Sequence, residues 1–370
     1  MRQAAASLLA LEQIVRKVWG ENAATLHLCR RSARLGLSCI ALQAAASVSA
    51  RSLSFFTRRQ QVAHTRCLDR KQNHNMGKER FTINPFPALE LSDAVKNQLL
   101  ELGRTIIEAN FERDDAFFKT GRKLPAILSV VRVEGKLDDM MYGVVNPTLE
   151  EMRIKASYVH DFDGAAVLST IVEPTVDEPF NSVVVKWLEM DLPLRRTGIV
   201  QNRDYVYLEC TGFVRMANGD RAGYHFLHSI DFPQIPKLSD RVRGDMSICG
   251  FFRQVGPNVI DVCKTGLMDP AGDMIRMLAV PVMTEAFLSP LRYVHCGQMR
   301  KLTWKMEKAH SEARLHGAPN PGPTCVSCGK PSTGWTLGKS ATTCKCCFRV
   351  LCSGCKIKKK ISLVTADLTL

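Results

Sequence analysis

The sequence lacks several features that would assign it to a common class of protein. It has no apolar run of about 18 residues, the length that a helix needs to cross a bilayer. It contains no nucleophile elbow, no HExxH motif and no glycine-rich phosphate loop. These absences argue against a helical membrane protein, a serine hydrolase, a zinc protease and a nucleotide-binding enzyme, and we assign no catalytic residues.

Acidic residues are scarce at both ends of the chain, which carry all of the excess positive charge. The formal net charge is +14 over 370 residues. Residues 1–75 hold twelve Lys/Arg against three Asp/Glu, and residues 325–370 hold eight against one, so the middle of the chain is almost neutral. A nucleic-acid-binding core normally carries the basic face itself, so the distribution argues against a nucleic-acid partner.

Residues 1–75 form a basic extension that we exclude from the fold. The segment is rich in Ala, Ser and Arg, a composition typical of a mitochondrial targeting segment. A disordered extension, or a start site placed too far upstream, accounts for the same composition, and Met76 then opens the folded protein.

Residues 76–315 contain two predicted helices, with many predicted strands between them. Residues 91–116 show apolar residues at helical spacing, with Ser92 as the expected cap. A long helix is predicted over about 283–315, where Pro290 either kinks or starts it.

The predicted strands are β-branched runs bounded by turn residues. Such runs occupy 124–134, 156–162 and 181–192. Asn218-Gly219 predicts a hairpin between two strands within 204–232, and Gly256-Pro257 separates two further strands within 246–273. The order predicts an α+β domain whose last helix covers one face of an antiparallel sheet.

Four segments of this domain resemble the START lipid-transfer domains. They are "RDYVYL" (203–208), "SIDFPQIP" (229–236), "GFFRQVG" (250–256) and "DPAGDMI" (269–275). The resemblance covers about residues 90–310 and implies a helix-grip fold, in which a curved antiparallel sheet wraps the C-terminal helix. It also implies a tunnel between sheet and helix that encloses a lipid, a sterol or another apolar molecule.

The residues of such a tunnel cannot be assigned from the sequence. Seven large apolar residues either line a cavity or fill a core, and the core is the more common place for such residues: Trp187, Phe213, Phe226, Phe251, Phe252, Met274 and Met277. Four polar residues either orient a headgroup or lie on the solvent face, which strand alternation favours for most of them: Glu189, Glu209, His225 and His228.

Half of the fourteen cysteines lie near the end of the chain, after a Pro/Gly-rich linker at 316–324. They include three CxxC pairs: Cys325 and Cys328, Cys344 and Cys347, and Cys352 and Cys355, with Cys346 as an extra thiol. Two thiolates on one tight turn can bind the same ion, so the pairs predict a Zn²⁺ module over residues 325–370.

This module resembles a FYVE zinc finger, a family that docks on phosphatidylinositol 3-phosphate in endosomal membranes. The resemblance rests on "CKCCFRVLCSGC" (344–355) and on Trp335 nine residues earlier. It implies that Cys325, Cys328, Cys352 and Cys355 close one zinc site, and that Cys344 and Cys347 form half of a second. The family's Arg/His run is replaced by Ser340-Ala341-Thr342-Thr343, and residues 356–370 contain no fourth pair. The finger is therefore degenerate or truncated.

The sequence thus predicts a non-enzymatic lipid-binding or lipid-transfer protein whose zinc module docks on an anionic membrane or on a protein partner. The lysine-rich "KIKKK" (356–360) either assists membrane association or is a solvated face. One alternative is a zinc-dependent interaction adaptor with a filled core, and a weaker one is a cyclase-like enzyme. The expected location is the cytoplasm with peripheral attachment to endosomes, or the mitochondrion if residues 1–75 are a transit segment.

Overall fold

The computed structural model describes residues 82–112, 126–159, 162–190, 201–216, 219–272, 283–331 and 342–365. The basic extension 1–75, Met274, Met277 and Trp335 lie outside these residues. None of the helices in the described part is long and apolar enough to cross a membrane.

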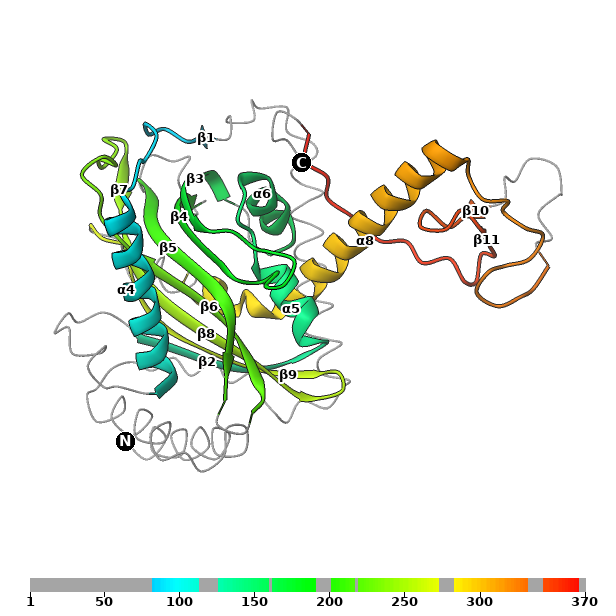
Figure 1. The fold of residues 1–370 in the computed structure, drawn as a ribbon, viewed down its shortest axis with the longest axis horizontal. Coiled ribbons are helices and arrows are strands. Elements are labelled where there is room, and N and C mark those ends of the chain that lie inside the picture. Colours follow the sequence, from blue (N-terminus) through cyan, green and yellow to red (C-terminus); the bar gives the residue numbers. More distant parts are fainter. Residues whose placement is uncertain are drawn as a thin grey trace.

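In the described part of the chain, one nine-stranded sheet forms the body of the protein (Figure 1). Its order is β1-β3-β4-β5-β6-β8-β9-β2, and β7 pairs with one end of β5. The pairings are antiparallel except for β1 with β3 and β5 with β7. The strands are β1 (Thr82–Ile83), β2 (Ala126–Glu134), β3 (Phe162–Val172), β4 (Ser182–Met190), β5 (Asn202–Arg215), β6 (Arg221–Ser229), β7 (Arg241–Arg243), β8 (Asp245–Gly256) and β9 (Val259–Asp269).

Helices cover both faces of the sheet. In the described residues the helices with assigned bounds are α4 (Asp93–Glu112), α5 (Leu137–Val144), α6 (Leu149–Tyr158) and α8 (Pro290–His316), and residues 283–288 are also helical. On one face, Leu99 and Ile106 of α4 pack on Leu208 of β5, and we name it the α4 face. On the other, Tyr293 and Val294 of α8 pack with α5 and with β2 and β9, and we name it the α8 face. A sheet that grips its C-terminal helix in this way is the predicted α+β helix-grip fold.

Several local predictions are confirmed. Ser92 caps α4, because its Oγ accepts a hydrogen bond from Val95 N at 3.4 Å. Strands β5 and β6 pair as the predicted hairpin, with Gly219 at φ 85° in the connection. Pro290 starts α8, where its missing N–H costs no helical hydrogen bond.

The prediction of a strand at 156–162 is wrong. Ala156 and Tyr158 belong to α6, and β3 begins only at Phe162. A capping box starts α6, in which Glu151 N donates to Thr148 Oγ1 at 3.2 Å and the Glu151 carboxylate accepts from Thr148 N at 3.3 Å. This nucleus extends the helix through a segment whose residues otherwise favour a strand. Helix α5, helix α6 and strand β3 were not predicted.

Helices α5 and α8 cross at a close contact between two glycines. A Cβ added to Gly143 would lie 1.9 Å from Tyr293 O, and one added to Gly297 would lie 1.9 Å from Asp139 O. Both distances are far below any van der Waals contact, so the crossing requires glycine on each helix. The contact fixes the first turns of α8 on α5.

We expect Gly297→Ala to lower the free energy of unfolding by about 1–3 kcal/mol, because the added methyl group forces the two helices apart. Urea unfolding measures the loss. Gly256→Ala is the matched control, since a Cβ there would meet Val259 at an ordinary 3.7 Å. Equal effects of the two substitutions would contradict the close crossing.

The second half of α8 leads away from the sheet to a small module that contains the cysteines (Figure 1). Its two-stranded sheet pairs β10 (Thr342–Thr343) with β11 (Val350–Leu351). The chain then runs back along α8, and Ser362 N donates to Tyr158 Oη of α6 at 2.6 Å. The C-terminal segment therefore ties the module to the larger domain.

Candidate functional site

A row of buried residues, polar except for Gly250, crosses the α8 face of the sheet. Its members are successive cross-strand neighbours on six strands, from β4 to β2: Ser182, Thr211, His225, Gly250, Lys264 and Ser129. All six are buried. Because cross-strand neighbours share one face of a sheet, the row is continuous.

More polar side chains join this row from the adjacent positions and from the helices above it. Lys186 and Glu209 lie on the sheet. Asn146 follows the end of α5, and Lys155 lies on α6. Ser289 and Tyr293 lie at the start of α8. We name the row and these six residues the polar belt.

Apolar clusters lie on both sides of the polar belt. One contains Val131, Phe252, Ile260 and Val262 together with residues of α5 and α8. The other contains Ile127, Tyr205, Met246 and Met268 together with Met283 and Phe287. The packed interface between the sheet and α8 is therefore apolar at both ends and ionisable in the middle.

Glu209 is the centre of the belt. Its carboxylate forms an ion pair with Lys186, accepts a hydrogen bond from His225 Nε2 at 2.7 Å, and lies 4.0 Å from Lys155 Nζ. Asn146 supports the same two lysines, since its backbone O accepts from Lys186 Nζ at 2.7 Å and its Oδ1 lies 3.5 Å from Lys155 Nζ. Glu209 is thus the anionic partner of both Lys186 and Lys155.

Lys264 stands apart from that carboxylate. Its Nζ donates to Ala286 O at 2.8 Å and to Ser289 Oγ at 3.2 Å, and Ser289 Oγ lies 2.7 Å from Tyr293 Oη. The ring of Tyr293 in turn lies 5.2 Å from Lys155 Nζ. No carboxylate in the described residues forms an ion pair with Lys264.

Burial sets the protonation of the belt. It lowers the pKa of Lys264 to about 7 and that of Lys155 to about 8. Burial also lowers the pKa of His225 to about 4, so this imidazole is neutral and donates its Nε2 proton to Glu209. Burial alone would raise the pKa of Glu209, but Lys186, His225 and Lys155 together hold it well below its ordinary value.

Lys264→Met should make the protein more stable at pH 7 and remove part of its pH dependence. The native pKa is about 7 and the ordinary value is 10.5, so between them the unfolded chain binds more protons and Lys264 makes stability rise with pH. The difference in stability, wild type minus variant, should therefore rise by up to about 1.4 kcal/mol per pH unit from pH 7 to pH 10.

Urea unfolding at pH 7, 8 and 9 measures this slope. The control is Lys301→Met, because that side chain is 45% exposed and pairs with Asp139 at 2.6 Å on the outside of α8. A difference that stays constant with pH would show that Lys264 is not buried as a titrating amine.

The four polar residues singled out from the sequence are not on a solvent face. Glu209 and His225 belong to the belt, and Glu189 is buried on the α4 face, 3.0 Å from Arg241 Nη2. His228 is half-buried on that same face, 3.0 Å from Ser247 Oγ. The expectation of solvent exposure is wrong because helices and loops cover both sides of these strands.

The aromatic candidates divide between the two faces. Trp187, Phe226 and Phe251 lie in the core under α4, so they cannot line a space beside α8. Phe252 and the partly buried Phe213 belong to a cluster on the α8 face. The residues that sequence reasoning missed are Lys155, Lys186 and Lys264, which gave no signal because isolated lysines are normally exposed.

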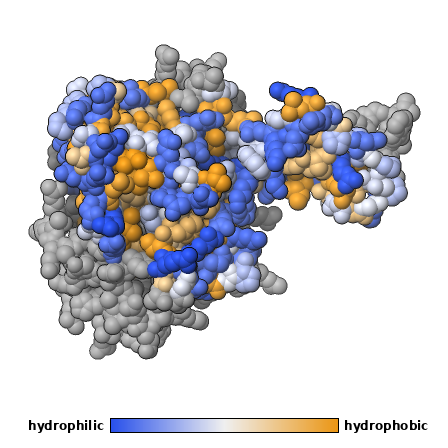
Figure 2. Space-filling view, viewed as in Figure 1, coloured by the Kyte–Doolittle hydropathy of each residue, from blue (hydrophilic) through white to orange (hydrophobic). Residues whose placement is uncertain are grey.

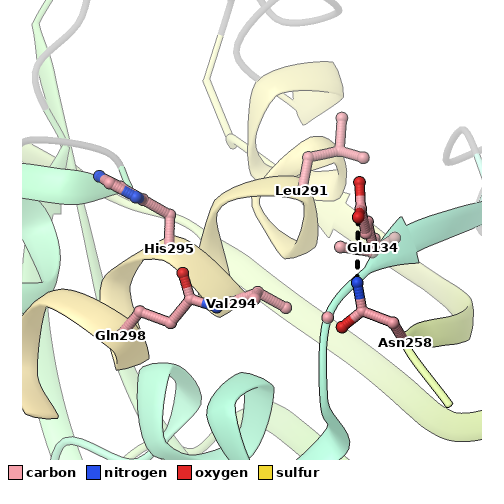
Figure 3. Close-up of a pocket in the computed structure, with 8 residues that line it drawn as sticks. Glu134, Asn258, Leu291, Val294, His295 and Gln298 are labelled. Carbon is pink, nitrogen blue, oxygen red and sulfur yellow. Dashed lines mark hydrogen bonds between the residues drawn. The ribbon is translucent and has the colours of Figure 1, made fainter. Parts of the chain in front are cut away.

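A surface hollow of about 340 Å³ marks the seam between α8 and the edge strand β2 (Figure 3). Leu291, Val294 and His295 line it from α8, and Glu134 faces them from the end of β2. Asn258 Nδ2 donates to Glu134 Oε1 at 3.0 Å across its floor. The hollow thus lies on the surface where the first turns of α8 meet the end of β2, and Val294 still packs against β2 there.

Four cysteines of the module form a candidate metal centre. The Sγ atoms of Cys325, Cys328, Cys352 and Cys355 all lie within 4.8 Å of one another, so this group can hold a metal ion. A tetrahedral ion with metal–sulfur bonds of about 2.3 Å places its sulfurs about 3.8 Å apart. The distance between Cys328 Sγ and Cys352 Sγ is 3.7 Å. The four thiols therefore fit one tetrahedral ion.

Backbone geometry holds these thiols in place. Cys325 lies in a tight turn in which Gly329 N donates to Cys325 O at 2.9 Å and Gly329 takes φ 69°. Backbone N–H groups of Cys352, Cys328 and Ser327 lower the pKa of the Cys325 thiol to about 6. Thiolates are the form that binds metals, so the turn favours coordination.

Cys344 and Cys347 lie outside this group of four. They belong to a second turn, in which Phe348 N donates to Cys344 O at 2.8 Å and Cys346 N approaches Cys344 Sγ at 3.4 Å. The Phe348 ring packs on His310 of α8, with ring centroids 5.2 Å apart. A second metal site at this turn stays a prediction.

Comparisons with known proteins give similarity only at the level of structure. No protein-family model matches the sequence, and no curated protein matches it. The structure is similar to human StAR-related lipid transfer protein 5, with 15% identity over 55% of this chain and 98% of that one and a TM-score of 0.39.

Two further solved structures are similar. Human STARD10 has 19% identity over 55% of this chain and 76% of that one, with a TM-score of 0.35. A STAR-related lipid transfer protein from Xanthomonas axonopodis has 18% identity over 48% of this chain and 88% of that one, also with a TM-score of 0.35. TM-scores this low carry no argument about the fold. The fold is defined by the strand order and by the position of α8 in this chain.

Proposed function

We propose that the protein binds a lipid between the α8 face of its sheet and α8, and transfers it between membranes without chemical change. The observation that carries this proposal is the composition of the interface between the sheet and α8, which is apolar at both ends and polar in the middle. Such a composition matches an amphiphile. Each CH₂ group that leaves water for this interior contributes about 0.8 kcal/mol, so an acyl chain supplies the affinity.

Uptake requires α8 to move relative to the sheet. The Gly143–Gly297 crossing holds the first turns of α8 on α5, and Leu291, Val294 and His295 of the same turns border the hollow at β2. We therefore expect the lipid to enter and leave at the seam between Leu291, Val294 and the end of β2. Opening and closing of such an element commonly limits the rate of exchange.

Native mass spectrometry of the full chain from a cellular extract tests carriage. We expect one lipid mass per protein, and transfer of that lipid between donor and acceptor vesicles. Repeated recovery of the empty protein, together with no transfer, would refute lipid carriage.

A second candidate function is an interaction adaptor that carries nothing. The observation that favours it is the dense packing around α5 and α8, where Met140, Met141 and Phe287 are fully buried. The same mass spectra separate the two functions, because an adaptor is recovered empty and fails to exchange lipid.

We further propose that the ion held by Cys325, Cys328, Cys352 and Cys355 is Zn²⁺. Four thiolates in a tetrahedron are the donor set of structural zinc sites. The ion would supply folding free energy to the module and no catalysis. Cys344 and Cys347 would contribute half of a second site.

The module would position the lipid-binding domain at an anionic, endosomal membrane as a peripheral protein. Lys356, Lys358, Lys359 and Lys360 are exposed, and Ile357 beside them is 78% exposed. Figure 2 shows hydrophilic and hydrophobic side chains together on the module and the adjoining part of α8. Near an anionic leaflet each lysine contributes up to about 1 kcal/mol. A protein partner with an acidic surface is the alternative occupant.

Liposome flotation tests the docking surface. We expect binding to vesicles that contain phosphatidylserine, with little added preference for phosphatidylinositol 3-phosphate, because Ser340-Ala341-Thr342-Thr343 replaces the basic headgroup-reading run. Strong selectivity for the phosphoinositide would overturn the second expectation, and no flotation on any anionic vesicle would favour a protein partner.

A further inference from the structure

The polar belt holds more positive than negative groups. Lys155, Lys186 and Lys264 come from α6, β4 and β9, and all three amines are enclosed by the protein. Glu209 is the carboxylate that faces Lys186 and Lys155, whereas the neutral His225 adds no charge. When all three lysines are protonated, the belt carries a surplus of two positive charges.

This surplus is costly without a further anion. An ammonium group buried in an apolar interior loses its hydration, and hydrogen bonds to neutral oxygens replace that hydration only in part. Lys264 illustrates the deficit, since its acceptors are the carbonyl of Ala286 and the hydroxyl of Ser289. An oxyanion placed beside Lys264 and Lys155 would offset the cost of burying their charge and keep both amines protonated.

Lys264, which has no ion pair within the described part of the chain, and Lys155, which shares Glu209 with Lys186, both border Tyr293. The Tyr293 hydroxyl bonds to Ser289, which contacts Lys264, and the Tyr293 ring lies beside Lys155. Next to Lys264, an atom added at the Cβ position of Gly250 would meet Phe252 and Lys264 only at 3.5–3.6 Å. One carbon atom therefore fits beside Lys264 at ordinary contact distance, and a larger acidic group would require α8 and the sheet to separate.

We propose that the polar belt binds the acidic group of the carried lipid, a carboxylate or a phosphate, and that Lys264 and Lys155 are the two cations that contact it. The apolar clusters on either side of the belt then hold the acyl part. This inference rests on the proposed lipid carriage and adds its substrate class, an acidic lipid in place of a neutral one such as a sterol.

Calorimetric titration of the full chain with four probes tests the inference. Dodecanoate and dodecyl phosphate carry the acidic group on a twelve-carbon chain, dodecanol carries the same chain without charge, and inorganic phosphate carries the charge without the chain. We expect at least one of the two acidic chains to bind ten times or more tightly than dodecanol, because a charge-assisted hydrogen bond is among the strong ones.

Two variants assign the cations. Lys264→Met and Lys155→Met should each weaken binding of the preferred acidic chain about tenfold and leave dodecanol unchanged. In both, Glu209 keeps its ion pair with Lys186, so no carboxylate loses its only partner. Lys301→Met, which removes a charge outside the belt, should change neither affinity.

Each other outcome overturns the inference. If the wild type binds dodecanol and both acidic chains equally well, lipid carriage stands but the acidic-group site is refuted. The same holds if both variants lose as much affinity for dodecanol as for the acidic chains. Inorganic phosphate binding as tightly as dodecyl phosphate would assign the belt to a free anion. Failure of every chain to bind would refute the proposed function itself, and the acidic-group site with it.

Discussion

Replacing Glu209 with glutamine is expected to lower the free energy of unfolding by about 3–5 kcal/mol at pH 7. The substitution keeps the shape of the side chain and removes its charge. Lys186 and Lys155 then remain in the interior without the carboxylate that both face. Removing one partner of a buried ion pair is costly because the other charge stays desolvated, whereas the loss of an exposed ion pair costs little.

Urea unfolding of three variants separates charge from packing. Glu209→Gln should show the full loss, and the double variant Glu209→Gln with Lys186→Met should recover most of it, because the ammonium in direct contact with the carboxylate is gone and only the more distant Lys155 stays without it. Glu101→Gln, on the exposed surface of α4 where the carboxylate pairs with Arg104, should stay within about 0.5 kcal/mol of the wild type. A double variant as unstable as the single one would show that the belt acts through shape alone.

The acid limb of the stability profile gives an independent check. The native pKa of Glu209 lies well below its ordinary value of 4.5, so its charge stabilises the fold above about pH 4.5. This contribution is lost as the pH falls toward the native pKa. Glu209→Gln should therefore unfold with less dependence on pH below pH 5 than the wild type.

The parts of the fold that could be predicted are those with strong local signals. The β5–β6 hairpin follows from Asn218-Gly219, and the start of α8 follows from Pro290. The quartet of cysteines followed from a family resemblance, and the Sγ positions agree with it. Helix α6 also had a local signal that was not used, the Thr148-x-x-Glu151 capping box.

The polar belt could not be predicted, for a physical reason. Alternation of polar and apolar residues normally distinguishes the solvent face of a strand from its buried face, and that assumption favoured the solvent face for most of the four polar candidates, which include Glu209 and His225. Here α4 and α8 cover the two faces, so alternation separates one buried face from another. Nor can one sequence show that Lys155 and Lys264, over a hundred residues apart, enclose the same space.

The second large effect concerns the metal. We expect the purified protein to contain one firmly held Zn²⁺ per chain, and Cys352→Ser to reduce this to less than one-tenth. A structural zinc site of four thiolates contributes on the order of 10 kcal/mol to the folding of a small module, because the ligands are brought together only in the folded state. Loss of one ligand should therefore unfold the module around the four cysteines and expose it to protease.

Elemental analysis under reducing conditions, with limited proteolysis of the same samples, measures both effects. Cys346→Ser is the matched control, because this thiol lies in the same module but outside the group of four. It should keep its zinc and its resistance to protease. Two ions per chain would show that Cys344 and Cys347 complete a second site, and no zinc in the wild-type protein would remove the metal centre altogether.

The same variant tests how the module and the lipid-binding domain depend on each other. The chain after Cys355 returns to α6 through the hydrogen bond of Ser362 to Tyr158, so loss of the metal should also release that contact. The large sheet has its own core and should unfold in urea almost as in the wild type. We therefore expect Cys352→Ser to bind lipid as before and to lose attachment to anionic vesicles, which separates carriage from docking within one chain.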